Sequence, residues 1–167
     1  MRVRLAVIAL VMLLCAAGSE SQAQAAPGLA RMRMRNDVGI ELLGKAAVYS
    51  FSYQRIVSSS MGLEVGLGAL GGGGSGDNAL LVFIPVSAKL YLIPKDGSLY
   101  LTGGAVFVTA AADQGPFSDS AADFYGHLGL GFEFRSTTGF LFRGTAYGLF
   151  GGGSWFVWPG LSIGYAF

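Results

Sequence analysis

The chain has 167 residues, which is enough for one domain, and 52% of them are hydrophobic while only 13% are charged. Its formal net charge of +1 provides no basic surface and argues against a nucleic-acid partner. The single cysteine, Cys15, lies near the N-terminus, so the rest of the chain has no disulfide framework and no thiolate for catalysis or metal binding.

The first 25 residues have the order of an export signal. Arg2 and Arg4 precede an uninterrupted apolar run at 5–17, and small residues follow up to Ala25. This run is too short for a membrane-spanning helix, which needs about 20 apolar residues. We therefore predict a cleavable signal peptide at 1–25, with cleavage after Ala25. This segment contains two of the 11 basic residues and one of the 10 acidic residues. Its removal leaves nine of each, so the mature chain is neutral.

Residues 26–36 show no hydrophobic period and are predicted to form a flexible N-terminal linker. Arg31, Arg33 and Arg35 lie in this segment. Short runs of like charge are usually solvated, which is the interpretation we adopt. The alternative is that these three side chains contact anionic lipid headgroups.

From residue 37 to residue 167 apolar residues recur at every second position, which is the period of a β-strand. Strands that cross a membrane at a tilt need about 9–11 residues, whereas globular strands average about 5–6. The predicted segments are of the longer kind. Pro85 cannot donate a ladder hydrogen bond, so we expect a bulge or a local break there. Eight strands are predicted, at 37–44, 48–55, 61–70, 80–92, 98–109, 123–135, 140–149 and 159–167.

The connections between these strands alternate in length. Those after the second, fourth and sixth strands are short, and those after the third, fifth and seventh, at 71–79, 110–122 and 150–158, are longer. Outer-membrane barrels have short periplasmic turns and longer external loops, so this pattern predicts periplasmic N- and C-termini. The first connection, at 45–47, should then be external, although it is unusually short.

Each predicted strand has one large apolar face and one small or polar face. In a soluble barrel the apolar face would line a ligand cavity, whereas in a membrane barrel it faces lipid. The charges favour the membrane barrel, because a cationic side chain at the bilayer midplane costs roughly 2–4 kcal/mol. An eight-stranded barrel is only wide enough for its own side chains. We therefore predict a polar network that fills the lumen, made of Glu41, Glu64, Lys89, His127, Glu133 and Arg143, with Gln54, Thr102 and Thr145 beside it.

The last strand has apolar residues at alternate positions, Leu161, Ile163 and Tyr165, and ends on Phe167. This pattern resembles the C-terminal insertion signal of outer-membrane barrels, which implies recognition by the barrel-assembly machinery. Short blocks at 41–45, 140–144 and 158–167 also resemble the poorly characterised small β-barrel proteins of the bacterial outer membrane.

That resemblance implies an all-β fold over residues 37–167, an eight-stranded antiparallel up-and-down transmembrane barrel. It also implies a Gram-negative cell envelope, with outer-membrane lipid and lipopolysaccharide around a monomeric barrel.

No catalytic, cofactor or metal site is predicted. Some lipid A deacylases are eight-stranded barrels in which a serine follows the catalytic histidine by two positions, but Gly129 stands two positions after His127. The glycine run at 71–77 lacks the lysine of a phosphate-binding loop. The spacing of four aspartates matches no calcium loop; these are Asp77, Asp113, Asp119 and Asp123.

These observations predict a non-enzymatic barrel of structural or interaction type with a plugged polar lumen. A porin-like aqueous channel needs about 16 strands. One alternative is a narrow channel or a carrier for a small, hydrophobic ligand. The other is a membrane hydrolase that modifies lipid A or phospholipid.

Overall fold

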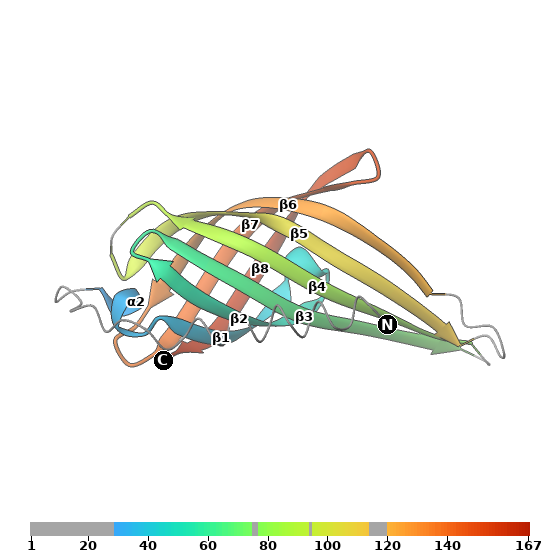
Figure 1. Ribbon diagram of the computed structural model, residues 1–167, viewed down its shortest axis with the longest axis horizontal. Helices are drawn as coiled ribbons and strands as arrows, with labels where there is room; N and C mark the ends of the chain where they lie inside the picture. The colour runs from blue at the N-terminus through green and yellow to red at the C-terminus, as the bar shows by residue number, and fades with distance from the viewer. Residues whose placement is uncertain (1–28, 75–76, 94, 114–119) are drawn as a thin grey trace.

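The computed structural model describes residues 29–167 apart from 75–76, 94 and 114–119. The described strands form one closed antiparallel barrel in which each strand pairs with its sequence neighbours and the last pairs with the first (Figure 1). The predicted eight-stranded up-and-down barrel is therefore confirmed, while the predicted leader and Ala25 lie outside the described residues. The strands are β1 (Asn36–Leu43), β2 (Tyr49–Ser58), β3 (Met61–Gly74), β4 (Asp77–Tyr91), β5 (Gly97–Asp113), β6 (Ser120–Arg135), β7 (Phe140–Gly151) and β8 (Ser154–Ala166).

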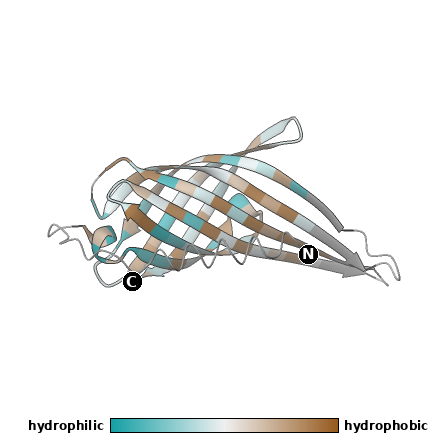
Figure 2. Ribbon diagram, in the orientation of Figure 1, coloured by the Kyte–Doolittle hydropathy of each residue, from teal (hydrophilic) through white to brown (hydrophobic). Residues whose placement is uncertain are grey.

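The two-residue period of the strands places charged side chains inside and apolar side chains outside. In β7, Leu141, Arg143 and Thr145 are buried, whereas Phe140 and Phe142 are exposed. Brown and pale or teal segments alternate along the strands in the same way (Figure 2). The barrel is thus apolar on its outer surface and charged within. No helix in the described part of the chain is long and apolar enough to cross a membrane.

The strands are longer than predicted at one end of the barrel, so much of the three long connections predicted there is paired strand, while residues 75–76 and 114–119 of those connections lie outside the described residues. β3 and β4 pair as far as Gly74↔Asp77, β5 and β6 as far as Ala111↔Ser120, and β7 and β8 as far as Gly151↔Ser154. Backbone hydrogen bonds form these extensions. Glycine- and alanine-rich segments can therefore pair without an alternating pattern of side chains.

Pro85 interrupts one ladder, as predicted. The β3–β4 pairing stops after Val65↔Val86 and resumes at Gly68↔Phe83 with the same register. On the other side of β4 the pairing with β5 continues through Pro85↔Val106. The result is a local break without a bulge.

The first connection is short, and it folds into the lumen instead of forming a loop outside the barrel. Residues Gly44–Ala46 form a single 3₁₀ turn, η1, and all three are buried. Leu43 and Ala47 flank the turn with φ angles of 59° and 68°, a region that non-glycine residues rarely adopt. The chain therefore turns sharply into the lumen between β1 and β2.

The described part of the segment predicted as a flexible linker contacts the barrel. Ala30–Arg33 form a short helix, α2, at the end of the barrel where the C-terminus lies (Figure 1). The backbone amide of Ala30 donates to the Asp96 carboxylate at 2.8 Å, and Arg31 is buried. Below, this end is called the α2 end, and the opposite end, with the extended hairpins, the distal end.

Two glycines on adjacent strands provide a test of lumen packing. A Cβ on Gly131 would lie 2.5 Å from Cζ of Tyr100 and 2.9 Å from the carbonyl oxygen of Gly144. A Cβ on Gly144 would meet nothing nearer than 3.8 Å. We expect Gly131→Ala to lower the free energy of unfolding by about 1–3 kcal/mol, because overpacking a filled interior forces its neighbours to shift.

Gly144→Ala is the matched control and should change this free energy by less than about 1 kcal/mol, since substitutions in strands span only about that range. Urea titration of the protein in lipid vesicles would measure both variants. Equal effects of the two substitutions would contradict a tightly packed interior at Tyr100.

Candidate functional site

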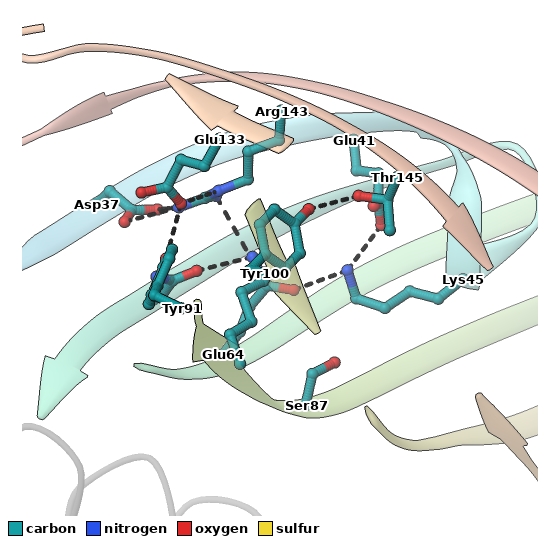
Figure 3. Close-up of polar contacts among 12 residues, drawn as sticks. Asp37, Glu41, Lys45, Glu64, Ser87, Tyr91, Tyr100, Glu133, Arg143 and Thr145 are labelled. Carbon is teal, nitrogen blue, oxygen red and sulfur yellow. Dashed lines mark hydrogen bonds and ion pairs between the residues drawn. The ribbon is translucent and has the colours of Figure 1, made fainter. Parts of the chain in front are cut away.

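The lumen holds a continuous network of buried ionised side chains, drawn in part in Figure 3. Each member is no more than 3% exposed apart from Glu64 at 4%. Four acids balance four bases, so the network carries no net charge. The acids are Asp37, Glu41, Glu64 and Glu133, and the bases are Lys45, Lys89, Arg135 and Arg143.

Glu64 on β3 is the centre of one half of the network. Its carboxylate oxygens lie 2.7 Å from Nζ of Lys45 and 2.6 Å from Nζ of Lys89. Arg143 approaches the same carboxylate at 3.8 Å, and Lys45 also pairs with Glu41 at 2.7 Å. Because Lys45 belongs to η1, these ion pairs hold the inward turn in place.

Arg143 on β7 is the centre of the other half. Its guanidinium lies 2.9 Å from Asp37 on β1 and 2.7 Å from Glu133 on β6. Arg135 pairs with the same two carboxylates, at 2.5 Å and 3.3 Å respectively. The first strand is thus joined by charge to the sixth and seventh strands across the lumen.

Tyrosine rings and a glutamine fill the space around the charges. The Tyr91 hydroxyl donates to Glu133 at 2.7 Å and accepts from Gln54 at 2.6 Å, and Gln54 also accepts from Lys89 at 2.7 Å. Tyr147 donates to Glu41 at 2.6 Å. Tyr100 shares a hydrogen bond with Thr145, as Figure 3 shows. These bonds satisfy lone pairs that would otherwise be costly to bury.

Five of the six residues predicted to form the lumen network lie in it together. The sixth, His127, faces the lumen outside the ion pairs. Its Nε2 lies 3.0 Å from Oγ of Ser87, its ring meets Tyr147 edge to face at 5.8 Å, and its Nδ1 has no hydrogen-bond partner within the described chain. The five that the ion pairs join are Glu41, Glu64, Lys89, Glu133 and Arg143.

Three members of the network were not predicted. Asp37 and Arg135 occupy inward positions of β1 and β6. Asp37 lies four residues before Glu41, and Arg135 lies two residues after Glu133. The strand period therefore contained the signal for both. Lys45 gave no such signal, because it lies on a turn rather than on a strand.

Arg31 closes the α2 end of the lumen, so the expectation that it is solvated is wrong. Its guanidinium donates to the backbone carbonyls of Ser59 at 3.5 Å, of Ile93 at 3.3 Å and of Lys95, and stacks 4.2 Å above the Tyr91 ring. Burial lowers the pKa of Arg31 from its usual value. By contrast Arg33 is exposed. Within the described residues no group of three His, Cys, Asp or Glu could hold a metal ion.

Solved structures of bacterial outer-membrane proteins share this architecture. The N-terminal β-barrel domain of Pseudomonas aeruginosa OprF superposes with a TM-score of 0.57 at 17% identity, over 80% of this chain and 99% of that one. Ail, the attachment invasion locus protein of Yersinia pestis, superposes with a TM-score of 0.53 at 16% identity, over 79% and 94%. The fold is that of the small eight-stranded outer-membrane β-barrels. No protein-family model and no curated protein matches the sequence.

The central position of Glu64 leads to a test of the network. Glu64→Gln leaves Lys89 with only a neutral partner, Gln54, and gives the lumen a net positive charge. We expect the free energy of unfolding to fall by about 3–5 kcal/mol, the usual cost of breaking a buried ion pair from one side. Urea titration in lipid vesicles, followed by tryptophan fluorescence, would measure the loss.

The double variant Glu64→Gln/Lys89→Met should recover part of this loss because it restores charge balance. Arg33→Gln, which removes an exposed charge, should have almost no effect. A double variant less stable than Glu64→Gln alone would show that charge balance does not govern the stability of the lumen.

Proposed function

We propose that the protein is a non-enzymatic outer-membrane barrel of structural or interaction type with a closed lumen. The observation that carries this proposal is the apolar outer surface around a charged, filled interior. Monomeric soluble proteins rarely expose apolar patches of more than a few hundred Å². Lipid as the outer solvent accounts for this surface. Its exposed side chains include Val38, Ile40, Phe51, Leu67, Phe107, Leu128, Leu130, Phe132, Phe134, Phe140, Leu161 and Ile163.

Three layers support a closed rather than a conducting lumen. Arg31 covers the α2 end, the ion network fills the middle, and η1 lies between the network and the distal end. Arg31 is anchored by hydrogen bonds to the turns at the α2 end, and the other two layers are anchored to strands. These contacts favour the closed barrel over the narrow channel, because permeation would require several buried ion pairs to separate at once.

The proposed orientation places the α2 end in the periplasm. Both ends of the described chain lie there, and the extended hairpins lie at the other end, as in outer-membrane barrels with long external connections. On β8, Leu161, Ile163 and Tyr165 point outward and are exposed, as is the terminal Phe167. This arrangement suits recognition by the barrel-assembly machinery, and it would put lipopolysaccharide around the distal end.

The contact between Ser87 and His127 is a poor basis for catalysis. A serine nucleophile needs a base that a third group orients and a route for substrate. His127 is completely buried, Ser87 is 2% exposed, and no carboxylate in the described chain bonds to Nδ1 of His127. The pair is better suited to a structural role inside the lumen, which argues against the lipid-hydrolase alternative.

Planar-bilayer recording tests the closed lumen. We expect the wild-type protein to give no steady current above that of a protein-free bilayer. Glu64→Ala/Lys89→Ala removes two interior side chains without changing net charge, and should produce resolvable current steps because it opens space along the axis. A steady wild-type current whose size changes in this double variant would support the narrow channel instead.

Cell fractionation tests the location. We expect the full-length protein in the outer-membrane fraction, with a faster gel mobility before boiling than after it, because closed barrels resist detergent. Phe167→Ala should reduce the assembled form, and Phe140→Ala, at another exposed aromatic of the same end, serves as the control. Recovery of the wild-type protein in the soluble periplasmic fraction, without a mobility shift, would contradict the proposal.

A further inference from the structure

Within the described chain, the strand pairing of the barrel wall stops short at the distal end. β6 pairs with β7 only as far as Gly126↔Phe150, although β6 continues to Ser120 along β5. On the other side of the hairpin, β1 pairs with β8 no further than Leu43↔Gly160. The tip of the β7–β8 hairpin therefore has no strand partner outside itself in the described chain, and it stands away from the end of β6 in Figure 1.

A pocket of about 570 Å³ lies at this gap. Ala47 beside η1 lines it, as do Phe156 and Trp158 of the hairpin. Phe124 and Phe150 also line it, although both belong to the outer face of the wall. Inner-face and outer-face residues can line one cavity only where the wall is open. Among the described residues, the pocket is therefore open to the side of the barrel as well as to its distal mouth.

The polar atoms of Trp158 and Tyr125 already form hydrogen bonds with backbone carbonyls beside the pocket. Nε1 of Trp158 donates to the carbonyl of Ala47 at 3.3 Å, and the Tyr125 hydroxyl donates to the carbonyl of Lys45. These bonds fix the rings against η1 and leave their faces as the binding surface. A ligand would consequently meet aromatic faces rather than hydrogen-bonding groups.

Asp123 provides the one charge among the described residues that line the pocket. Its carboxylate accepts a hydrogen bond from the amide of Phe124 at 2.7 Å and forms no ion pair within the described chain. Its side chain is exposed. The pocket therefore combines aromatic faces with an uncompensated negative charge at its rim. That combination attracts cations and repels anions such as fatty-acid carboxylates.

We propose that this distal pocket binds a small hydrophobic cation, an alkylated amine or quaternary ammonium compound. The positive group lies beside Asp123, where ring faces add cation–π attraction. The apolar body lies beneath Phe156 and Trp158. The volume is within the range of small-molecule sites, about 300–1,000 Å³. This site goes beyond the closed-barrel function, because η1 separates it from the filled lumen.

The two tryptophans of the chain, Trp155 and Trp158, both lie on β8 and allow a direct test. Trp155 is 74% exposed and does not line the pocket. In the otherwise full-length protein, Trp155→Phe leaves Trp158 as the only tryptophan, which reports on the pocket. The protein would be held in nanodiscs of zwitterionic phosphatidylcholine and titrated with octyltrimethylammonium, octanol and octanoate, each below its micellar concentration.

We expect a saturable change in Trp158 fluorescence with octyltrimethylammonium, and binding at least about fivefold weaker for octanol and octanoate, the factor that 1 kcal/mol of cation–π attraction gives. Asp123→Asn in the same background should reduce this preference, because the carboxylate charge is lost while the ring faces remain. Asp96→Asn, the same change at the α2 end, should preserve it. Phe156→Ala should weaken binding of octyltrimethylammonium.

Gel mobility before boiling would show that each variant still folds, independently of binding. A signal that rises without saturation for all three compounds would show partition into lipid only and would overturn the proposal. Saturable binding that is equal for octanol and octyltrimethylammonium, or unchanged in Asp123→Asn, would overturn the assignment to cations.

Discussion

Charge neutralisation in a closely filled interior is the constraint on which this barrel depends. Eight strands enclose only enough volume for their own side chains, so every inward charge must meet its counter-charge there. The strands alone supply four carboxylates but only three cationic groups. The fourth cation, Lys45, comes from η1. The inward turn of the first connection is therefore part of the electrostatic balance of the lumen. Arg31 closes the α2 end separately, and backbone carbonyls and a tyrosine ring stabilise its charge.

The exterior is simple by comparison. Each outward position needs only to be apolar and large enough to cover the sheet, because lipid makes no directional demands on a side chain. The two surfaces therefore place different requirements on the sequence. An outward residue needs only to be apolar, whereas an inward charged residue needs specific partners. Glu64 and Arg143 illustrate the second requirement, since each contacts residues from several strands or turns.

The strand period was enough to predict the fold and much of the lumen, because alternate positions must face opposite sides of a sheet. It identified Glu64 and Arg143 before any contact was known. Arg31 and Lys45 could not be found in this way, because a short helix and a single turn have no strand period. The distal pocket was equally hidden. It depends on where the pairing between β6 and β7 ends, and that boundary is set by backbone hydrogen bonds in glycine-rich sequence.

The ion pairs of Asp37 also bear on the order in which the barrel assembles. Asp37 lies on the first strand, yet its partners Arg135 and Arg143 follow it by 98 and 106 residues. Contacts so distant in the chain form late, after long loops have closed. A sheet that lacks β6 and β7 therefore carries an unpaired carboxylate on its inner face. The same residues that stabilise the finished barrel therefore leave a charged inner face on an unfinished one.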